Sequence, residues 1–185
     1  MDPERAKYLR IIERRFLELR GRGLMLSPRD VMLVESWRQR EIPTRVILGA
    51  LEDGARRFWE GRPHGTPLPA SLAYFAPHID DATRQRIADL IEASPVLLFM
   101  KGVRGAPQCG FSAQVCQVLD RLLPDYTTHD VLSDPEIREG IKAFSSWPTI
   151  PQVYVKGEFI GGSDILIEMY NSGELKEKLE IALAS

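Results

Sequence analysis

One cysteine at the edge of a loop is the residue of this chain best placed to do chemistry. Cys109 follows Pro107-Gln108, and the helical pattern that runs from Phe111 to Leu123 starts just after it. Free backbone N–H groups and the dipole at the start of a helix stabilise a thiolate. Lys101, at the end of the preceding apolar segment, would add positive charge nearby. We therefore predict that Cys109 is a reactive thiol rather than a buried structural cysteine.

The second cysteine cannot be its disulfide partner. Cys116 lies further along the same predicted helix, about 10 Å away at the usual rise of about 1.5 Å per residue. A disulfide needs Cα atoms within about 7 Å of one another. Cys116 is therefore predicted to be a core residue. Ser112 occupies the position where a Cys-x-x-Cys motif would carry its second thiol, so any redox cycle must use an external thiol.

Two further segments have the composition of ligand-binding loops. Trp147-Pro-Thr-Ile-Pro151 has two prolines before a predicted strand, which suggests a rigid bend with a cis bond between Ile150 and Pro151. Gly161-Gly-Ser-Asp164 opens a helix after a strand, where free N–H groups suit a carboxylate ligand and Asp164 could bind an amine. Each segment also has a purely structural interpretation: the prolines of the first would only mark a loop, and Ser163 or Asp164 of the second would only cap the helix.

Upstream of these segments the sequence predicts a small all-α domain. Apolar residues at three- and four-residue spacing predict a helix that ends at Gly21-Arg22-Gly23. Ser27 has the features of an N-cap and Pro28 those of a first helical residue. A third helix is predicted over residues 43–59 and a short fourth one over residues 71–76.

From residue 81 onward the pattern is that of a compact α/β unit. Val96 to Met100 is an unbroken apolar run, as expected for a central strand covered on both faces. Lys156-Gly157 is a hairpin signal between two more predicted strands. Further elements are predicted as helices over 81–93, 111–123, 135–144, 164–170 and 174–184, and as strands over 126–131, 152–155 and 158–160. A short linker near residues 77–80 would separate domain 1–78 from domain 79–185.

Composition restricts the class of protein. A hydrophobic content of 44% and a charged content of 27% are ordinary for a globular protein, and no apolar run approaches the roughly 20 residues that cross a bilayer. Only two cysteines are present and the start lacks a signal-peptide pattern, so we expect a cytoplasmic protein without a membrane partner. Residues 1–80 carry 14 Lys and Arg against 11 Asp and Glu, an excess too small to favour nucleic acid as a partner.

The chemistry-bearing segments together resemble a known family. The stretch from Met100 to Ser112 with its Cys-Gly-Phe-Ser motif, the Trp147–Pro151 segment and the Gly161–Asp164 segment are similar in order and spacing to monothiol glutaredoxins of the Cys-Gly-Phe-Ser class. The resemblance runs from about residue 80 to the end. It implies an α/β thioredoxin-like domain, with a four-stranded mixed sheet and flanking helices, after the small all-α domain.

The resemblance also implies a groove for glutathione. The residues that it assigns to this groove are Lys101, Arg138, Thr149, Ile150, Pro151, Gly162, Ser163 and Asp164. The first two would hold the glycine carboxylate, the backbone before the cis proline would pair with the cysteinyl portion, and the three residues at the helix start would take the γ-glutamyl end. Many relatives carry cysteine in place of Ser163, a change that removes an auxiliary thiol but leaves the backbone contacts.

Proteins of this class typically bind a [2Fe–2S] cluster between two subunits. Cys109 would supply one thiolate from each chain, and two glutathione thiolates would complete four-sulfur ligation. The implied partners are glutathione, a second copy of the chain, and apo iron–sulfur or cluster-assembly proteins. The implied role is cluster assembly, cluster transfer, or iron and redox sensing.

Two alternative functions remain open. One is a weak glutathione-dependent oxidoreductase that acts on glutathionylated proteins. The other is a regulatory adaptor, whose N-terminal domain docks an unknown partner while the second domain senses iron or thiol status.

Overall fold

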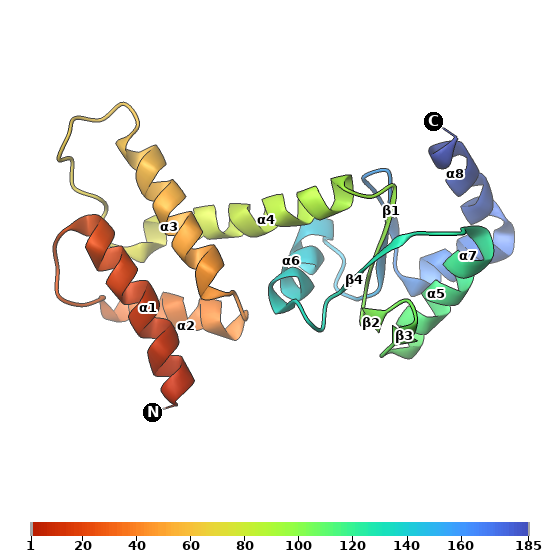
Figure 1. The fold of residues 1–185 in the computed structure, drawn as a ribbon, viewed down its shortest axis with the longest axis horizontal. Helices are drawn as coiled ribbons and strands as arrows, with labels where there is room; N and C mark the ends of the chain where they lie inside the picture. Colours follow the sequence, from red (N-terminus) through yellow and green to blue (C-terminus); the bar gives the residue numbers. More distant parts are fainter. Residues whose placement is uncertain (1, 185) are drawn as a thin grey trace. The chain divides into compact units, whose positions relative to one another are not determined.

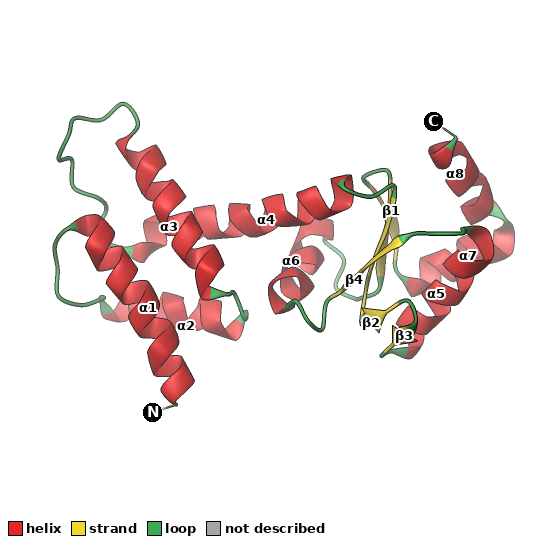
Figure 2. Ribbon diagram, in the orientation of Figure 1, coloured by secondary structure: helices red, strands yellow, loops and turns green. Residues whose placement is uncertain are grey.

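The computed structural model describes residues 2–184, which divide between Thr83 and Arg84 into two compact units. The first unit is entirely helical, and the second combines helices with strands (Figure 1, Figure 2). None of the described helices combines the length and the apolar character needed to span a bilayer.

The first unit begins with three helices whose ends follow the local sequence signals. They are α1 (Pro3–Arg20), α2 (Pro28–Gln39) and α3 (Thr44–Trp59), followed by a short 3-10 helix, η1 (Leu72–Tyr74), and the start of α4 (Ala76–Glu92). Gly21 ends α1 in the left-handed conformation, with φ of 64°, and the Ser27 side chain caps α2, as predicted. The core of the unit consists of buried apolar side chains from these helices, among them Ile12, Phe16, Val34, Trp37, Ile47, Leu51, Leu72, Phe75 and Ile79.

A buried carboxylate joins α2 to η1. Asp30, in the first turn of α2, is only 2% exposed. Its carboxylate accepts hydrogen bonds from the Ser27 hydroxyl at 2.7 Å, the Ser71 hydroxyl at 2.6 Å and the Leu72 backbone N–H at 2.8 Å. These bonds compensate the desolvation of the charge and connect segments that lie more than 40 residues apart in the chain.

The second unit contains the predicted four-stranded mixed sheet. Its strands are β1 (Val96–Met100), β4 (Thr127–Asp130), β5 (Gln152–Val155) and β6 (Glu158–Gly161). They are arranged in the order β4-β1-β5-β6, in which β1 pairs parallel with β4 and the other pairs are antiparallel. All five residues of β1 are buried, as its unbroken apolar run predicts.

Helices cover both faces of this sheet. They are α5 (Gly110–Leu122), α6 (Pro135–Ser145), α7 (Ser163–Ser172), α8 (Glu174–Leu183) and the later part of α4. Alternate residues of β1 enter two separate cores: Leu98 packs in the core that contains residues of α5, α7 and α8, whereas Phe99 packs with residues of α4 and α6. Since side chains alternate along a strand, β1 contributes to both cores, and so does β5 through Val153 and Tyr154.

The linker expected at residues 77–80 is helical instead. α4 starts at Ala76, and the division between the two units falls within this helix. Pro77 therefore marks a helix start rather than a break, since proline fits the first turn of a helix, where its missing N–H is not needed. Ile79 is fully buried in the core of the first unit. The predicted boundary between residues 78 and 79 thus lies inside a continuous helix.

Within the second unit, ion pairs connect α4 to the start of α6. The Arg86 guanidinium contacts Asp134 at 2.5 Å and Glu136 at 2.6 Å. Asp134 is also the N-cap of α6 and contacts the His129 ring nitrogen at 3.0 Å. These contacts set the position of α6, and therefore of the residues that project from it.

The Asp30 interactions predict a large loss of stability in Asp30→Ala. Removing the carboxylate leaves the Leu72 N–H and the Ser71 hydroxyl without their acceptor, so we expect the free energy of unfolding of the first unit to fall by about 2–4 kcal/mol. Urea denaturation of the full chain, followed by circular dichroism, measures this loss. Asp53→Ala removes an exposed carboxylate and should change stability by less than about 0.5 kcal/mol.

The stability of the first unit at acid pH should also depend on the hydrogen bonds of Asp30. Burial, the strongest single influence, acts to raise the pKa of Asp30, but the hydrogen bonds from Ser71, Ser27 and Leu72 together hold it below its ordinary value. Because the folded-state pKa is lowered, this stabilisation is complete above the unfolded value of about 3.9 and is lost as the pH falls through the folded value. Asp30→Ala should lack this part of the acid loss; an unchanged acid profile would contradict the assignment.

Candidate functional site

The Cys109 thiol lies at the point where α5 begins. Cys109 is the N-cap residue of this helix, is partly exposed, and has an extended backbone with φ of −152° and ψ of 138°. The backbone N–H of Ser112 lowers the pKa of the Cys109 thiol most strongly; the N–H of Phe111 and the charge of Lys101 also lower it, and partial burial opposes them. The net pKa is below that of an ordinary cysteine, so the helix start favours a thiolate.

Ser112 connects the sheet to this helix start. Its side chain is completely buried, and its hydroxyl accepts a hydrogen bond from the Lys101 backbone N–H at 3.2 Å. Lys101 directly follows β1, so the bond joins the end of the central strand to the first turn of α5. The residue in the position of a second motif cysteine therefore has a structural function beside the thiol.

A small hairpin shapes the segment between β1 and Cys109, where the sequence indicated only a loop. It consists of β2 (Gly102–Val103) and β3 (Ala106–Pro107). Gly102 has φ of 86°, and a Cβ there would lie 2.5 Å from the Ala106 carbonyl oxygen, so only glycine fits. The Gly102 N–H donates to the Asp130 carboxylate at 2.9 Å, which fixes the base of the hairpin against the end of β4.

Arg104 anchors the tip of the hairpin. Its guanidinium donates to Asp120 of α5 at 2.7 Å and lies 4.4 Å from the centre of the Tyr126 ring. The hairpin is therefore held against the helix that carries the thiol at its start. No local sequence pattern predicts the contacts of Arg104 with Asp120 and Tyr126, because these residues are well separated in the chain.

A cavity of about 830 Å³ opens beside the thiol. Its walls come from the end of β1, the start of α5, α6, the loop before β5 and the start of α7. The residues that line it are Lys101, Cys109, Phe111, Arg138, Lys142, Trp147, Pro148, Thr149, Ile150, Ser163 and Asp164. Seven of the predicted site residues thus surround one cavity. The other two, Pro151 and Gly162, do not line it but adjoin residues that do.

The charges around this cavity are unevenly distributed. Lys101, Arg138 and Lys142 supply three cations, whereas Asp164 is the one carboxylate among the lining residues. Lys142 also pairs with Glu139 at 2.9 Å. Sequence reasoning missed Lys142, although its spacing of four residues from Arg138 on a predicted helix places the two on one face. A ligand that carries carboxylates suits this side of the cavity.

The start of α7 provides a second anchoring point. Gly162 is its N-cap residue and makes no side-chain cap bond, so N–H groups of the first turn are available to a ligand carboxylate. A Cβ at Gly162 would lie 2.9 Å from the Trp147 indole nitrogen. Glycine at this position therefore lets Trp147, a lining residue, pack directly against the helix start.

The buried side-chain amide of Gln152 holds the loop before β5 in place. The predicted cis bond between Ile150 and Pro151 is present. Gln152 is completely buried, and its amide N–H groups donate to the carbonyl oxygens of Trp147 and Thr149, each at 3.1 Å. Sequence analysis missed Gln152, whose polar side chain in an otherwise apolar strand was the available signal.

Cys116 is a core residue, as predicted. It is 3% exposed, its sulfur lies 3.7 Å from the Met100 sulfur, and burial raises the pKa of its thiol. Within residues 2–184, no three His, Cys, Asp or Glu side chains are grouped as a metal site. Of the two thiols, both within the described residues, only that of Cys109 is therefore accessible.

Comparison with known proteins gives consistent results. The family model of glutaredoxins matches residues 96–160, all in the second unit. The monothiol glutaredoxin ycf64-like protein of Synechocystis is 60% identical over 103 residues, which are 56% of this chain and 96% of that protein.

Solved structures agree with this result. Reduced poplar apo GrxS14 is 44% identical, with a TM-score of 0.51 over 57% of this chain and 96% of the poplar chain. A buckwheat glutaredoxin–glutathione complex is 25% identical, with a TM-score of 0.50 over 56% of this chain and 92% of that chain. The predicted thioredoxin-like fold is confirmed.

The geometry around Cys109 predicts selective alkylation. Iodoacetamide should modify Cys109 with an apparent pKa below that of an ordinary thiol, because the thiolate faces N–H groups and Lys101. Lys101→Gln should raise that pKa, and the rate at neutral pH should fall. Mass spectrometry across a pH series measures both effects. Cys116→Ala serves as the control and should leave the profile unchanged; modification of Cys116 at a comparable rate would contradict the assignment.

Proposed function

Because the chain belongs to the monothiol glutaredoxin family, we propose that it binds glutathione and, with it, a [2Fe–2S] cluster shared by two copies of the chain. The cluster would be assembled, transferred to apo iron–sulfur or cluster-assembly proteins, or used to sense iron and redox state. The observation that carries the proposal is an activated, accessible thiol beside a cation-lined cavity, with no second thiol in reach.

The cavity suits the chemistry of glutathione. The tripeptide has two carboxylates, one amine and a thiol. The cations at Lys101, Arg138 and Lys142 complement its glycine carboxylate, and the free N–H groups at the start of α7 complement the γ-glutamyl carboxylate. Asp164 complements the amine. A glutathione thiol would then lie near Cys109, with the backbone of Ile150 alongside.

A cluster places a different demand on the site. A [2Fe–2S] cluster takes four sulfur ligands, whereas one chain presents a single accessible thiol. Cys109 from each of two chains, together with one glutathione per chain, supplies the four. The buried Cys116 cannot contribute, because its sulfur lies inside the core against Met100.

The same thiol also suits catalysis, which is the second candidate function. The Cys109 thiolate would attack the glutathione sulfur of a protein mixed disulfide, form a new disulfide with glutathione, and expel the protein thiolate, which takes up a proton. A second glutathione thiolate would then attack that disulfide, release oxidised glutathione and restore the Cys109 thiolate. Ser112 in place of a resolving cysteine is the observation that favours this two-glutathione route.

We further propose a cytoplasmic location, because both cysteines are free and the mechanism requires reduced glutathione. We also propose that the first unit docks a partner protein, as in a regulatory adaptor.

Glutathione binding should depend on Arg138. Arg138→Gln removes a cation that lines the cavity, so we expect the affinity for glutathione, measured by calorimetry on the full chain, to fall about tenfold. The matched control is Lys176→Gln, which removes an exposed cation on α8 and should bind like the unmodified protein. Equal affinities in the two variants would refute the assigned carboxylate site.

Cluster binding should depend on Cys109 and glutathione together. Anaerobic reconstitution with iron, sulfide and glutathione should give brown protein that elutes as a dimer. Cys109→Ser, or omission of glutathione, should leave it colourless and monomeric, whereas Cys116→Ala should still take up the cluster. A colourless monomer of the unmodified protein would exclude cluster carriage. Brisk turnover of a small glutathione mixed disulfide by that colourless protein would establish the catalytic alternative.

A further inference from the structure

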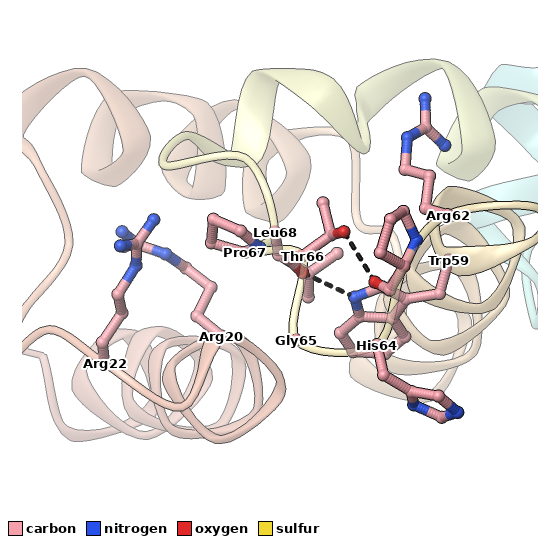
Figure 3. Close-up of a pocket in the computed structure, with 10 residues that line it drawn as sticks. Arg20, Arg22, Trp59, Arg62, His64, Gly65, Thr66, Pro67 and Leu68 are labelled. Carbon is pink, nitrogen blue, oxygen red and sulfur yellow. Dashed lines mark hydrogen bonds between the residues drawn. The ribbon is translucent and has the colours of Figure 1, made fainter.

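A second cavity, of about 720 Å³, lies within the first unit, which the glutaredoxin family model does not cover. Its walls come from the end of α1, the end of α3 and the loop that leads from α3 toward η1. Figure 3 shows the side chains of Arg20 and Arg22 rising from one side of it, while Trp59, Arg62 and His64 come from the other.

The lining of this cavity is strongly cationic. Three guanidinium groups, those of Arg20, Arg22 and Arg62, and the His64 ring border it, whereas no Asp or Glu is among its lining residues. Guanidinium groups gathered without a counter-charge repel one another, and a bound anion would relieve that repulsion. The arrangement therefore calls for an anionic ligand.

Most of the other arginines of the same unit are neutralised. Within the described residues, six of them form ion pairs with Asp or Glu: Arg5, Arg14, Arg15, Arg38, Arg40 and Arg56. Four more have no ion pair in this part of the chain but are solvent-exposed and outside the cavity: Arg10, Arg29, Arg45 and Arg57. What distinguishes the three cavity arginines is that they have no ion pair and all line one hollow, Arg20 and Arg22 together on one side and Arg62 on the other (Figure 3).

Two of these guanidinium groups are held in place before any ligand binds. Arg20 lies 5.4 Å from the centre of the Phe16 ring, and its Nε is buried without a hydrogen-bond partner among residues 2–184. Arg62 lies 4.3 Å from the centre of the Phe58 ring and donates to the Phe58 carbonyl oxygen. The Arg20 side chain therefore lines the cavity with its guanidinium placed against Phe16, and its buried Nε–H has no acceptor among residues 2–184.

An aromatic ring borders the same cavity. The Trp59 indole N–H donates to the Thr66 carbonyl oxygen at 2.9 Å, and the Thr66 hydroxyl donates to the Pro63 carbonyl oxygen at 2.7 Å (Figure 3). These bonds fix the ring while 39% of Trp59 stays exposed. A fixed, partly exposed indole beside guanidinium groups is suited to stack on a planar base.

We propose that this cavity binds a mononucleotide, with its phosphates on the arginines and its base against Trp59. Arginine forks match phosphate oxygens, and the volume lies within the roughly 300–1,000 Å³ of small-molecule sites. A nucleic acid strand is disfavoured as the ligand. Its backbone needs a continuous basic surface, whereas many arginines of this unit are ion-paired. Residues 1–80 also carry 14 Lys and Arg against 11 Asp and Glu, which is only a small positive excess.

Calorimetry on the full chain tests this site, with ATP in magnesium-free buffer, inorganic triphosphate and a ten-residue oligothymidylate as probes. We expect saturable ATP binding with a stoichiometry of one. Arg22→Gln should weaken ATP binding about tenfold. Arg57→Gln removes an equally unpaired, exposed arginine outside the cavity and should leave the affinity unchanged. Trp59→Leu should weaken ATP binding but not triphosphate binding.

Several results would overturn the proposal. Absence of ATP binding at millimolar concentration, or equal affinities of Arg22→Gln and Arg57→Gln, would remove the site. Tighter binding of the oligothymidylate than of ATP would identify a nucleic acid surface instead. Undiminished ATP affinity in Trp59→Leu would refute the stacked base and leave a bare phosphate site. Circular dichroism of each variant confirms that it is folded, and glutathione binding at the Cys109 cavity should be unaffected throughout.

Discussion

The free N–H groups at the start of α5 are the constraint on which the rest of the second unit depends. A thiolate is stabilised there only if the strand before the helix ends at the right place. The bond from the Lys101 N–H to the Ser112 hydroxyl fixes that meeting point, and β1 itself is buried on both faces. The hairpin of β2 and β3 then spans the short distance between strand and helix. Chemistry at Cys109 therefore rests on the rigid central strand.

Buried or partly buried charges at helix starts perform a similar task in both units. Asp30 lies in the first turn of α2 and joins it to η1, and Asp134 caps α6 and joins it to Arg86 of α4. In each case a carboxylate at the positive end of a helix dipole also accepts bonds from a distant segment. The contact between Arg86 and Asp134 also affects the Cys109 cavity, because it positions α6. This helix carries Arg138 and Lys142, two of the three cations that line that cavity.

The two cavities differ in how their charges are arranged. The cavity at Cys109 combines cations with a helix start, a thiol and one carboxylate, which suits a ligand with several different groups. The cavity in the first unit has guanidinium groups, an imidazole and an indole but no carboxylate, which suits a uniformly anionic ligand with an aromatic part. Each is built within one unit, so the two ligands are expected to bind to separate sets of residues.

Much of this protein could be predicted from local sequence alone. The helix ends at Gly21 and Ser27, the buried strand at 96–100 and the place of Cys109 before a helix follow from patterns within a few residues, because caps, apolar runs and dipoles act over one or two turns. The tertiary structure alone decided that Gln152 and Lys142 support the Cys109 cavity, and that three arginines without an ion pair line one cavity in the first unit. The residues that line each cavity come from segments far apart in the chain, and the free energy that brings those segments together comes from packing and charge compensation that no local pattern encodes.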